Sequence, residues 1–212
     1  MALLRRVAWV LMRGRPGTSA RTWCLVCCLL LGAGPGNLRV PGGISLGEPT
    51  LSAQTAPSKE YQVKAVFLFN FAQFVEWPPA AFADDKSPLV IGILGDDPFG
   101  AYLDEVVRAE RVGNRPMRVQ RYQRADEITT CHVLFISRSE EIRLGQILAS
   151  LKDRNILIVG DSDDFIQRAG MIQLATSQGK VHLRINVNAA RTANLTISSK
   201  LLRSAELVTG SK

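Results

Sequence analysis

Cysteine and histidine are scarce in this sequence. Its 212 residues include four cysteines and two histidines, and three of the cysteines come before residue 29. A chain that loses its N-terminal leader would keep only Cys131, so an intramolecular disulfide is excluded there. His132 and His182 stand fifty positions apart and form no zinc-binding motif. The sequence therefore predicts neither a metal site nor an internal disulfide.

Signatures of catalysis are also missing. No G-x-S-x-G, Walker A or H-E-x-x-H pattern occurs in the chain. Cys131 and His132 are adjacent, but neighbouring residues of a strand point to opposite faces, so this thiol and this imidazole cannot act as nucleophile and base together. We therefore interpret Cys131 as a buried strand residue. We expect a protein that is not an enzyme and that uses no cofactor.

A basic field over the folded part is a third absence. The formal net charge is +7, but residues 1–55 hold six arginines against one acid, Glu48. Of the chain's 26 basic and 19 acidic residues, 20 and 18 remain for the rest. Nucleic-acid-binding domains usually carry a strong positive patch or stripe, so we do not expect a nucleic-acid partner.

The apolar run of the N-terminal region, residues 23–31, is short. At about 1.5 Å per helical residue its nine residues cover about half of a hydrocarbon core that is about 30 Å thick. The arginine-rich stretch before it and "GAGPG" after it are typical of an export signal. We therefore expect residues 1–34 to be a cleaved signal peptide, so that the protein does not span the membrane. An uncleaved amphipathic start and a start at Met12 stay open, and acylation of Cys28 is less favoured because another cysteine precedes it.

The remainder divides into a spacer and one domain. Residues 35–58 are rich in Gly, Pro, Ser, Thr and Ala, which predicts a flexible spacer, and residues 59–208 are expected to form a single domain. Apolar runs predict strands over 89–95, 117–122, 131–137 and 155–160, and a hairpin over 171–187. Helices are expected over 58–75, 99–107, 139–152 and 163–169, with a long C-terminal helix over about 188–208. This order favours an α/β fold, a three-layer sandwich around a mostly parallel, mixed sheet.

Several polar residues are candidates for ligand binding. Lys64 lies on the apolar side of the first helix, so either its stem reaches water or it pairs with a carboxylate such as Asp96 or Asp97, which follow the first strand. Arg184 and Asn186 share one side of the hairpin with Asn188. These residues would suit an anionic ligand, although helix capping is favoured for Asp96, Asp97 and Asn186.

The acids of "GDSDD", Asp161, Asp163 and Asp164, are interpreted in the same way. They lack the spacing of a calcium loop of the EF-hand type. Capping of the helix that follows is therefore the favoured role for them.

The first helix also offers a candidate partner surface. Ser58 is its expected N-cap and Pro78 its stop. Phe71, Phe74 and Val75 are expected to pack on the sheet. The opposite edge mixes aromatic and polar side chains, which makes it the candidate partner surface: Phe69, Asn70, Gln73, Glu76 and Trp77.

Several blocks of the sequence resemble one known family. "YQVKAVFLFNFAQFVEWP", "IGILGDDPFG", "CHVLFIS" and "RINVNAARTANLTISSKLLRSAELV" occur in the order and spacing of the YfiR family of exported bacterial proteins. The resemblance covers about residues 61–208. It implies a periplasmic α/β protein without known enzymatic activity, which binds the periplasmic part of a membrane-bound diguanylate cyclase. Such binding lowers cyclic-di-GMP and favours motility over biofilm.

Cysteine is where the sequence departs from that family. The best-known members carry disulfides, whereas Cys131 has no companion in the expected domain. A homodimer stays open, but a bridge through Cys131 requires an exposed thiol. The alternative function is a periplasmic receptor for an anionic small molecule, held by Lys64, Asp96, Asp97, Arg184 and Asn186.

Overall fold

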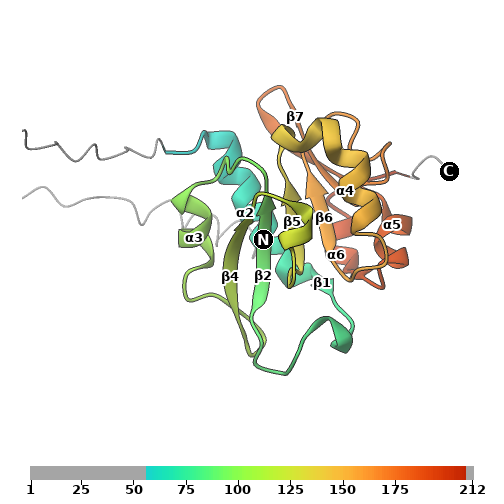
Figure 1. Cartoon of the computed structure of the whole chain (residues 1–212). Helices are drawn as coiled ribbons and strands as arrows, with labels where there is room; N and C mark the ends of the chain where they lie inside the picture. The colour runs from blue at the N-terminus through green and yellow to red at the C-terminus, as the bar shows by residue number, and fades with distance from the viewer. Residues whose placement is uncertain (1–55, 209–212) are drawn as a thin grey trace, which may run out of the picture. The chain divides into compact units, whose positions relative to one another are not determined.

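An eight-stranded mixed sheet runs through residues 56–208, the part of the chain that the computed structural model describes (Figure 1). The strand order is β10-β8-β7-β6-β5-β2-β4-β3, and all neighbours are parallel except β3 with β4 and β7 with β8. The predicted α/β fold around a mostly parallel sheet with a hairpin is confirmed. The expected signal peptide and most of the expected spacer lie outside the described residues. The strands are β2 (Leu89–Leu94), β3 (Arg111–Val112), β4 (Arg115–Tyr122), β5 (Val133–Ile136), β6 (Leu157–Gly160), β7 (Ile172–Ser177), β8 (Lys180–Ile185) and β10 (Glu206–Leu207).

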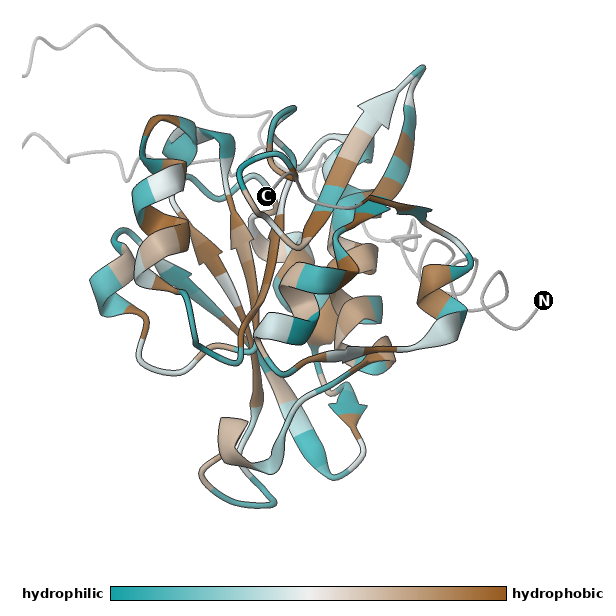
Figure 2. Ribbon diagram, turned by 90° about the vertical axis from the view of Figure 1, so that its right-hand side faces the viewer, coloured by the Kyte–Doolittle hydropathy of each residue, from teal (hydrophilic) through white to brown (hydrophobic). Residues whose placement is uncertain are grey.

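The central strands are buried along their whole length. Every residue of β2, β5 and β6 is buried, and Figure 2 shows hydrophobic residues concentrated along the middle of the sheet. Gly92 lets neighbouring side chains approach β2 closely, because a Cβ there would lie 2.7 Å from Cys131 Sγ and 2.8 Å from the Tyr122 ring. Cys131 is a buried free thiol, as predicted.

The long helix α2 (Lys59–Phe74) packs against one face of the sheet. It begins as predicted, with the Ser58 hydroxyl accepting a hydrogen bond from the Tyr61 backbone N–H. Phe71 and Val75 are buried and Phe74 packs on the core from a half-buried position. After Phe74 the chain becomes extended, and β1 (Val75–Glu76) pairs with β9 (Thr196–Ile197) before the short helix η1 (Pro79–Ala81).

The other helices cover both faces of the sheet. Right-handed crossovers place α3 (Ala101–Val107), between β2 and β4, on the face opposite to α4 (Leu144–Ser150), between β5 and β6. Figure 1 shows α4 in front of the sheet and α2 behind it. The short helices η2 (Ala125–Glu127) and η3 (Arg138–Arg143) precede β5 and α4. None of the described helices, all between residues 59 and 202, is long and apolar enough to cross a membrane.

The predicted long C-terminal helix is wrong. The chain forms α5 (Val187–Thr192), β9, α6 (Ser199–Leu202) and β10 instead. Asn194 takes a left-handed backbone conformation with φ of 57°, which ends the helix, and the β-branched pair of β9 extends to meet β1. Most of the apolar residues expected on this helix are buried, but they lie on these short segments and not on one continuous helix.

The strand order reverses between β2 and β5, where open α/β sheets usually leave a ligand crevice at the carboxyl ends. Here the loop that follows β2 and the loop that follows β5 contact each other. Gly95 has a φ of 87°, and a Cβ on it would collide with the Ser139 hydroxyl and lie 2.8 Å from Glu140 Cγ. The Ser139 hydroxyl accepts a hydrogen bond from the Asp96 N–H at 3.0 Å. The polar groups of this edge therefore lie to either side of the reversal point.

Candidate functional site

Lys64 is the most deeply buried charged residue of α2. Its side chain has 0% exposure, and its Nζ lies 2.6 Å from Asp161 Oδ2 and 2.6 Å from Glu60 Oε1. Glu60 stands one helical turn before Lys64, and Asp161 directly follows β6. The expectation that the stem reaches water is wrong, and the alternative of pairing with a carboxylate at the sheet edge is confirmed, although the partner is Asp161 and not Asp96 or Asp97. Burial of an ammonium group is tolerated here because two carboxylates pair with it.

Asp161 is the centre of this arrangement. Its Oδ2 accepts hydrogen bonds from Lys64 Nζ and, at 3.0 Å, from the Tyr61 hydroxyl. Arg138, which follows β5, donates to the Asp161 carbonyl at 2.8 Å, and its Nε lies 3.5 Å from Asp161 Oδ1. The expected capping role of Asp161 is therefore wrong. We call Glu60, Tyr61, Lys64, Arg138 and Asp161 the charge cluster.

The charge cluster shifts the pKa values of two of its members, Glu60 and Tyr61. Lys64 holds the pKa of Glu60 below its ordinary value of 4.5. Burial and the neighbouring Asp161 raise the pKa of Tyr61 to about 12. Thr176 of β7 donates to Glu60 at 2.8 Å, so the charge cluster joins the start of α2 to three strands of the sheet. The two cations of the charge cluster, Lys64 and Arg138, thus form ion pairs with its two carboxylates, Glu60 and Asp161.

Asp97 has the turn role that capping predicts. Its Oδ1 accepts from the N–H groups of Phe99 and Gly100 at 2.7 and 3.2 Å, just before α3. Its Oδ2 lies 2.7 Å from Arg121 Nε, and Arg121 also pairs with Asp104, so these carboxylates raise the pKa of the guanidinium. Asp96 is exposed and contributes its backbone N–H.

The two hairpin candidates make local contacts. Asn186 caps α5, because its Oδ1 accepts from the Ala189 N–H at 3.1 Å. Arg184 donates to Gln173 Oε1 at 3.1 Å and lies 3.4 Å from Glu206. Thus Lys64, Asp97 and Arg184 each belong to a separate set of contacts. The five candidate ligand residues are not brought together around one another.

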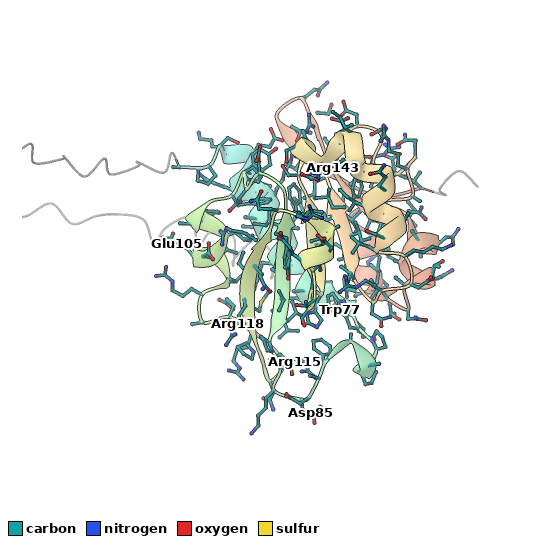
Figure 3. All side chains as sticks on the ribbon, in the orientation of Figure 1. Trp77, Asp85, Glu105, Arg115, Arg118 and Arg143 are labelled. Carbon is teal, nitrogen blue, oxygen red and sulfur yellow. The ribbon has the colours of Figure 1, made fainter. Side chains whose placement is uncertain are left out.

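The candidate partner surface lies at the end of α2. Gln73 and Glu76 are exposed, and Gln73 Nε2 donates to the Arg111 carbonyl at 3.2 Å. Phe69 and Asn70 are half-buried, and Phe69 packs on the core. Trp77 donates its ring N–H to the His132 carbonyl at 3.2 Å, and Figure 3 labels it near the lower end of the sheet. The exposed part of this surface is therefore mostly polar.

A second cluster, which the sequence did not predict, lies beside Trp77. The His132 ring stacks on the Phe82 ring with centroids 4.4 Å apart. Arg115 Cζ lies 3.7 Å from the centroid of the same Phe82 ring. His132 Nδ1 accepts from the Val90 N–H at 3.0 Å, so Nε2 carries the proton and donates to the Ala81 carbonyl at 3.1 Å. Burial lowers the pKa of His132. We call Trp77, Phe82, Arg115 and His132 the aromatic stack.

A groove of about 480 Å³ opens between η2 and α4. We call it the arginine groove, because three arginines line it together with two isoleucines and a buried glutamate. No candidate residue from the sequence belongs to it, since its lining comes from three separate segments that only the fold brings together. These residues are Arg124, Ile128, Glu140, Arg143, Ile147 and Arg154.

A family model described as DUF4154, YfiR/HmsC-like, matches residues 61–206. The matched range extends from the first turn of α2 to β10. No curated protein matches the chain.

Proposed function

Because the chain belongs to the YfiR/HmsC-like family, a family of periplasmic regulators of diguanylate cyclases, we propose that it restrains a membrane-bound diguanylate cyclase. In this proposal the domain binds the periplasmic part of the cyclase and lowers cyclic-di-GMP without catalysing a reaction. Residues 1–34 serve as the export signal and residues 35–58 as a spacer. The match over residues 61–206 is the observation that carries the proposal.

The contacts at the carboxyl edge support a binding protein. Lys64 and Arg138 both pair with Asp161, so the charged groups of the charge cluster already have partners within the domain. The alternative of a receptor for an anionic metabolite has less support, because Lys64, Asp97 and Arg184 are engaged in three separate sets of contacts.

We place the partner contact at the end of α2. Gln73 and Glu76 are exposed there, beside the half-buried Phe69, Asn70 and Trp77. Reversing the charge of Glu76 with Glu76→Arg is expected to relieve repression of the cyclase while the domain stays folded. Lys59→Glu, at the other end of the same helix, is the matched control and is expected to repress normally.

Deletion of the gene tests the proposed function directly. Cyclic-di-GMP and surface attachment are expected to rise in the deletion strain and to return to their starting levels when the gene is restored on a plasmid. Extraction and mass spectrometry measure the nucleotide. An unchanged cyclic-di-GMP level in the deletion strain contradicts the proposed function.

A further inference from the structure

The arginine groove carries one positive charge that the described residues do not balance. Arg124 binds Asp126 through two N–H groups at 3.0 and 2.8 Å. Arg143 lies 2.7 Å from the carboxylate of Glu140, whose side chain is 6% exposed. Arg154 instead donates to two carbonyls, those of Ile128 and Thr129, at 2.8 and 3.1 Å.

Carbonyl oxygens orient Arg154 without neutralising it. Within residues 56–208 no carboxylate forms an ion pair with this guanidinium, and the residue is only half-buried. Arg124 and Arg143, which line the same groove, are themselves 69% and 56% exposed, so solvent reaches both guanidinium groups. The lining thus holds one guanidinium group without a paired acid, that of Arg154, and guanidinium groups bind carboxylates through two parallel N–H donors.

The surroundings of the groove suit a segment of a protein. Residues 123–132 connect the two parallel strands β4 and β5 with a single short turn, η2, where such connections usually hold a helix. Part of the surface beside α4 is therefore left without a covering element. The groove is open, whereas sites for small molecules usually enclose about 70–90% of the ligand surface.

An exposed apolar residue is the sequence neighbour of one of the arginines that line the groove. Ile142, the residue before Arg143 in η3, has 97% exposure, the highest of the large apolar residues described. Single exposed apolar residues need no explanation by themselves, but an isoleucine beside a charged groove supplies the apolar contact that protein interfaces combine with arginine. The groove and Ile142 together fit a segment in which an acidic residue is close to an apolar one.

We infer that the arginine groove docks an acidic segment of the cyclase's periplasmic part. A carboxylate of this segment binds Arg154, and an apolar side chain packs on Ile142. This contact is additional to the one at the end of α2, and it rests on the proposed function. It assigns the η2–α4 side of the domain to partner recognition.

The test measures cyclic-di-GMP in the deletion strain that carries the full chain or one of its variants. Arg124→Glu and Ile142→Asp both place negative charge where the acidic segment would bind, and both side chains are exposed enough for the fold to tolerate the change. Arg191→Glu makes the same change at an exposed arginine of α5, away from the groove lining, and Arg124→Lys keeps the charge. Melting curves of the purified proteins show that each variant is folded.

Arg124→Glu and Ile142→Asp are expected to restore at least half of the increase that deletion causes, while Arg191→Glu and Arg124→Lys repress like the parent. If deletion raises cyclic-di-GMP but the two groove variants still repress, the inference is overturned and the proposed function stands. If Arg191→Glu relieves repression to the same extent, a general effect of charge explains the result and the inference is overturned. If deletion itself has no effect, the proposed function fails and the inference fails with it.

Two further outcomes would assign the groove to another occupant. A rise in the melting temperature with millimolar citrate that Arg154→Gln abolishes would make it a site for a small anion. A dimer of the purified chain that Arg124→Glu dissociates would make it a contact between two copies. Either result overturns the inference.

Discussion

The two ends of α2 are fixed to the sheet by different chemistry. At its start the charge cluster joins Lys64 to Asp161 and Glu60, with Lys64 and Asp161 fully buried. Just beyond its end the aromatic stack holds Trp77 against His132, whose ring is neutral and bonded to two backbone groups. Ion pairs hold the first region, whereas stacking and hydrogen bonds of a neutral imidazole hold the second.

This difference determines how each region responds to change. Removing one partner of a buried ion pair lowers the free energy of unfolding by several kcal/mol, because the other charge stays buried without a partner. A stacked neutral ring loses packing and one or two hydrogen bonds, which costs less. Substitutions and pH therefore distinguish the two regions.

Removal of Lys64 is expected to have the largest effect. Lys64→Met leaves Asp161 buried beside a neutral side chain and should lower the free energy of unfolding by about 3–5 kcal/mol. Urea denaturation followed by the fluorescence of Trp77, the only tryptophan in residues 56–208, measures the loss.

Two further variants control this experiment. Adding Asp161→Leu to Lys64→Met removes the unpaired charge and should recover a large part of the loss. Lys59→Met, an exposed change on the same helix, should stay within about 0.5 kcal/mol of the parent. A loss of less than about 1 kcal/mol for Lys64→Met would show that the charge cluster does not hold α2.

Loss of the His132 ring is expected to have an intermediate effect. His132→Ala removes the stacking partner of Phe82 and leaves the Val90 N–H without its acceptor, so the free energy of unfolding should fall by about 2–3 kcal/mol. The same urea experiment measures it. His182→Ala, at the exposed histidine of β8, should change stability by less than about 0.5 kcal/mol. Equal losses for the two alanine variants would contradict the role given to the aromatic stack.

Acid is expected to weaken the two regions in separate pH ranges. The pKa of His132 is lowered in the folded protein, so its contribution is present above its ordinary value of 6.5 and is lost as the pH falls below it. The pKa of Glu60 is lowered as well, so its contribution is present above 4.5 and is lost as the pH falls further. His132→Gln should therefore flatten the first decline and leave the second. Unfolding curves at a series of pH values test this, and a first decline that persists in His132→Gln would assign it to another group.

The smallest effect is expected at the rim of the charge cluster. Thr176→Val keeps the shape of the side chain and removes its hydrogen bond to Glu60 Oε1. The free energy of unfolding should fall by about 0.5–1 kcal/mol. Ser177→Ala, the next residue of β7, serves as the control in the same denaturation series. A loss above about 2 kcal/mol would mean that the hairpin itself depends on this contact.

Local signals in the sequence predicted the elements better than the contacts between them. Ser58 marked the start of α2 because a cap acts within one turn. Lys64 was recognised as unusual from its place on the apolar side of that helix, but its partner was not found. Asp161 stands in an acidic loop whose sequence looks like a helix cap, and nothing local distinguishes a cap from a buried counter-ion.

The errors at the C-terminus and at His132 have a related origin. Apolar spacing over residues 188–208 fits a helix, yet the same side chains are buried by α5, β9 and α6 because Asn194 turns the chain and β9 pairs with β1. For His132 the sequence indicated a strand position, which the structure places directly before β5. Phe82 and Arg115 could not be predicted as its neighbours, since they come from separate loops and strands.

The attachment of α2 also bears on the order in which the chain assembles. A ribosome makes α2 before any strand of the sheet, but Lys64 finds Asp161 only 97 residues later and Glu60 finds Thr176 only 116 residues later. Contacts so distant along the chain require closure of long loops and form slowly. The apolar side of the helix therefore stays uncovered during most of synthesis. The contacts at the start of α2 are therefore complete only after β7 has been made.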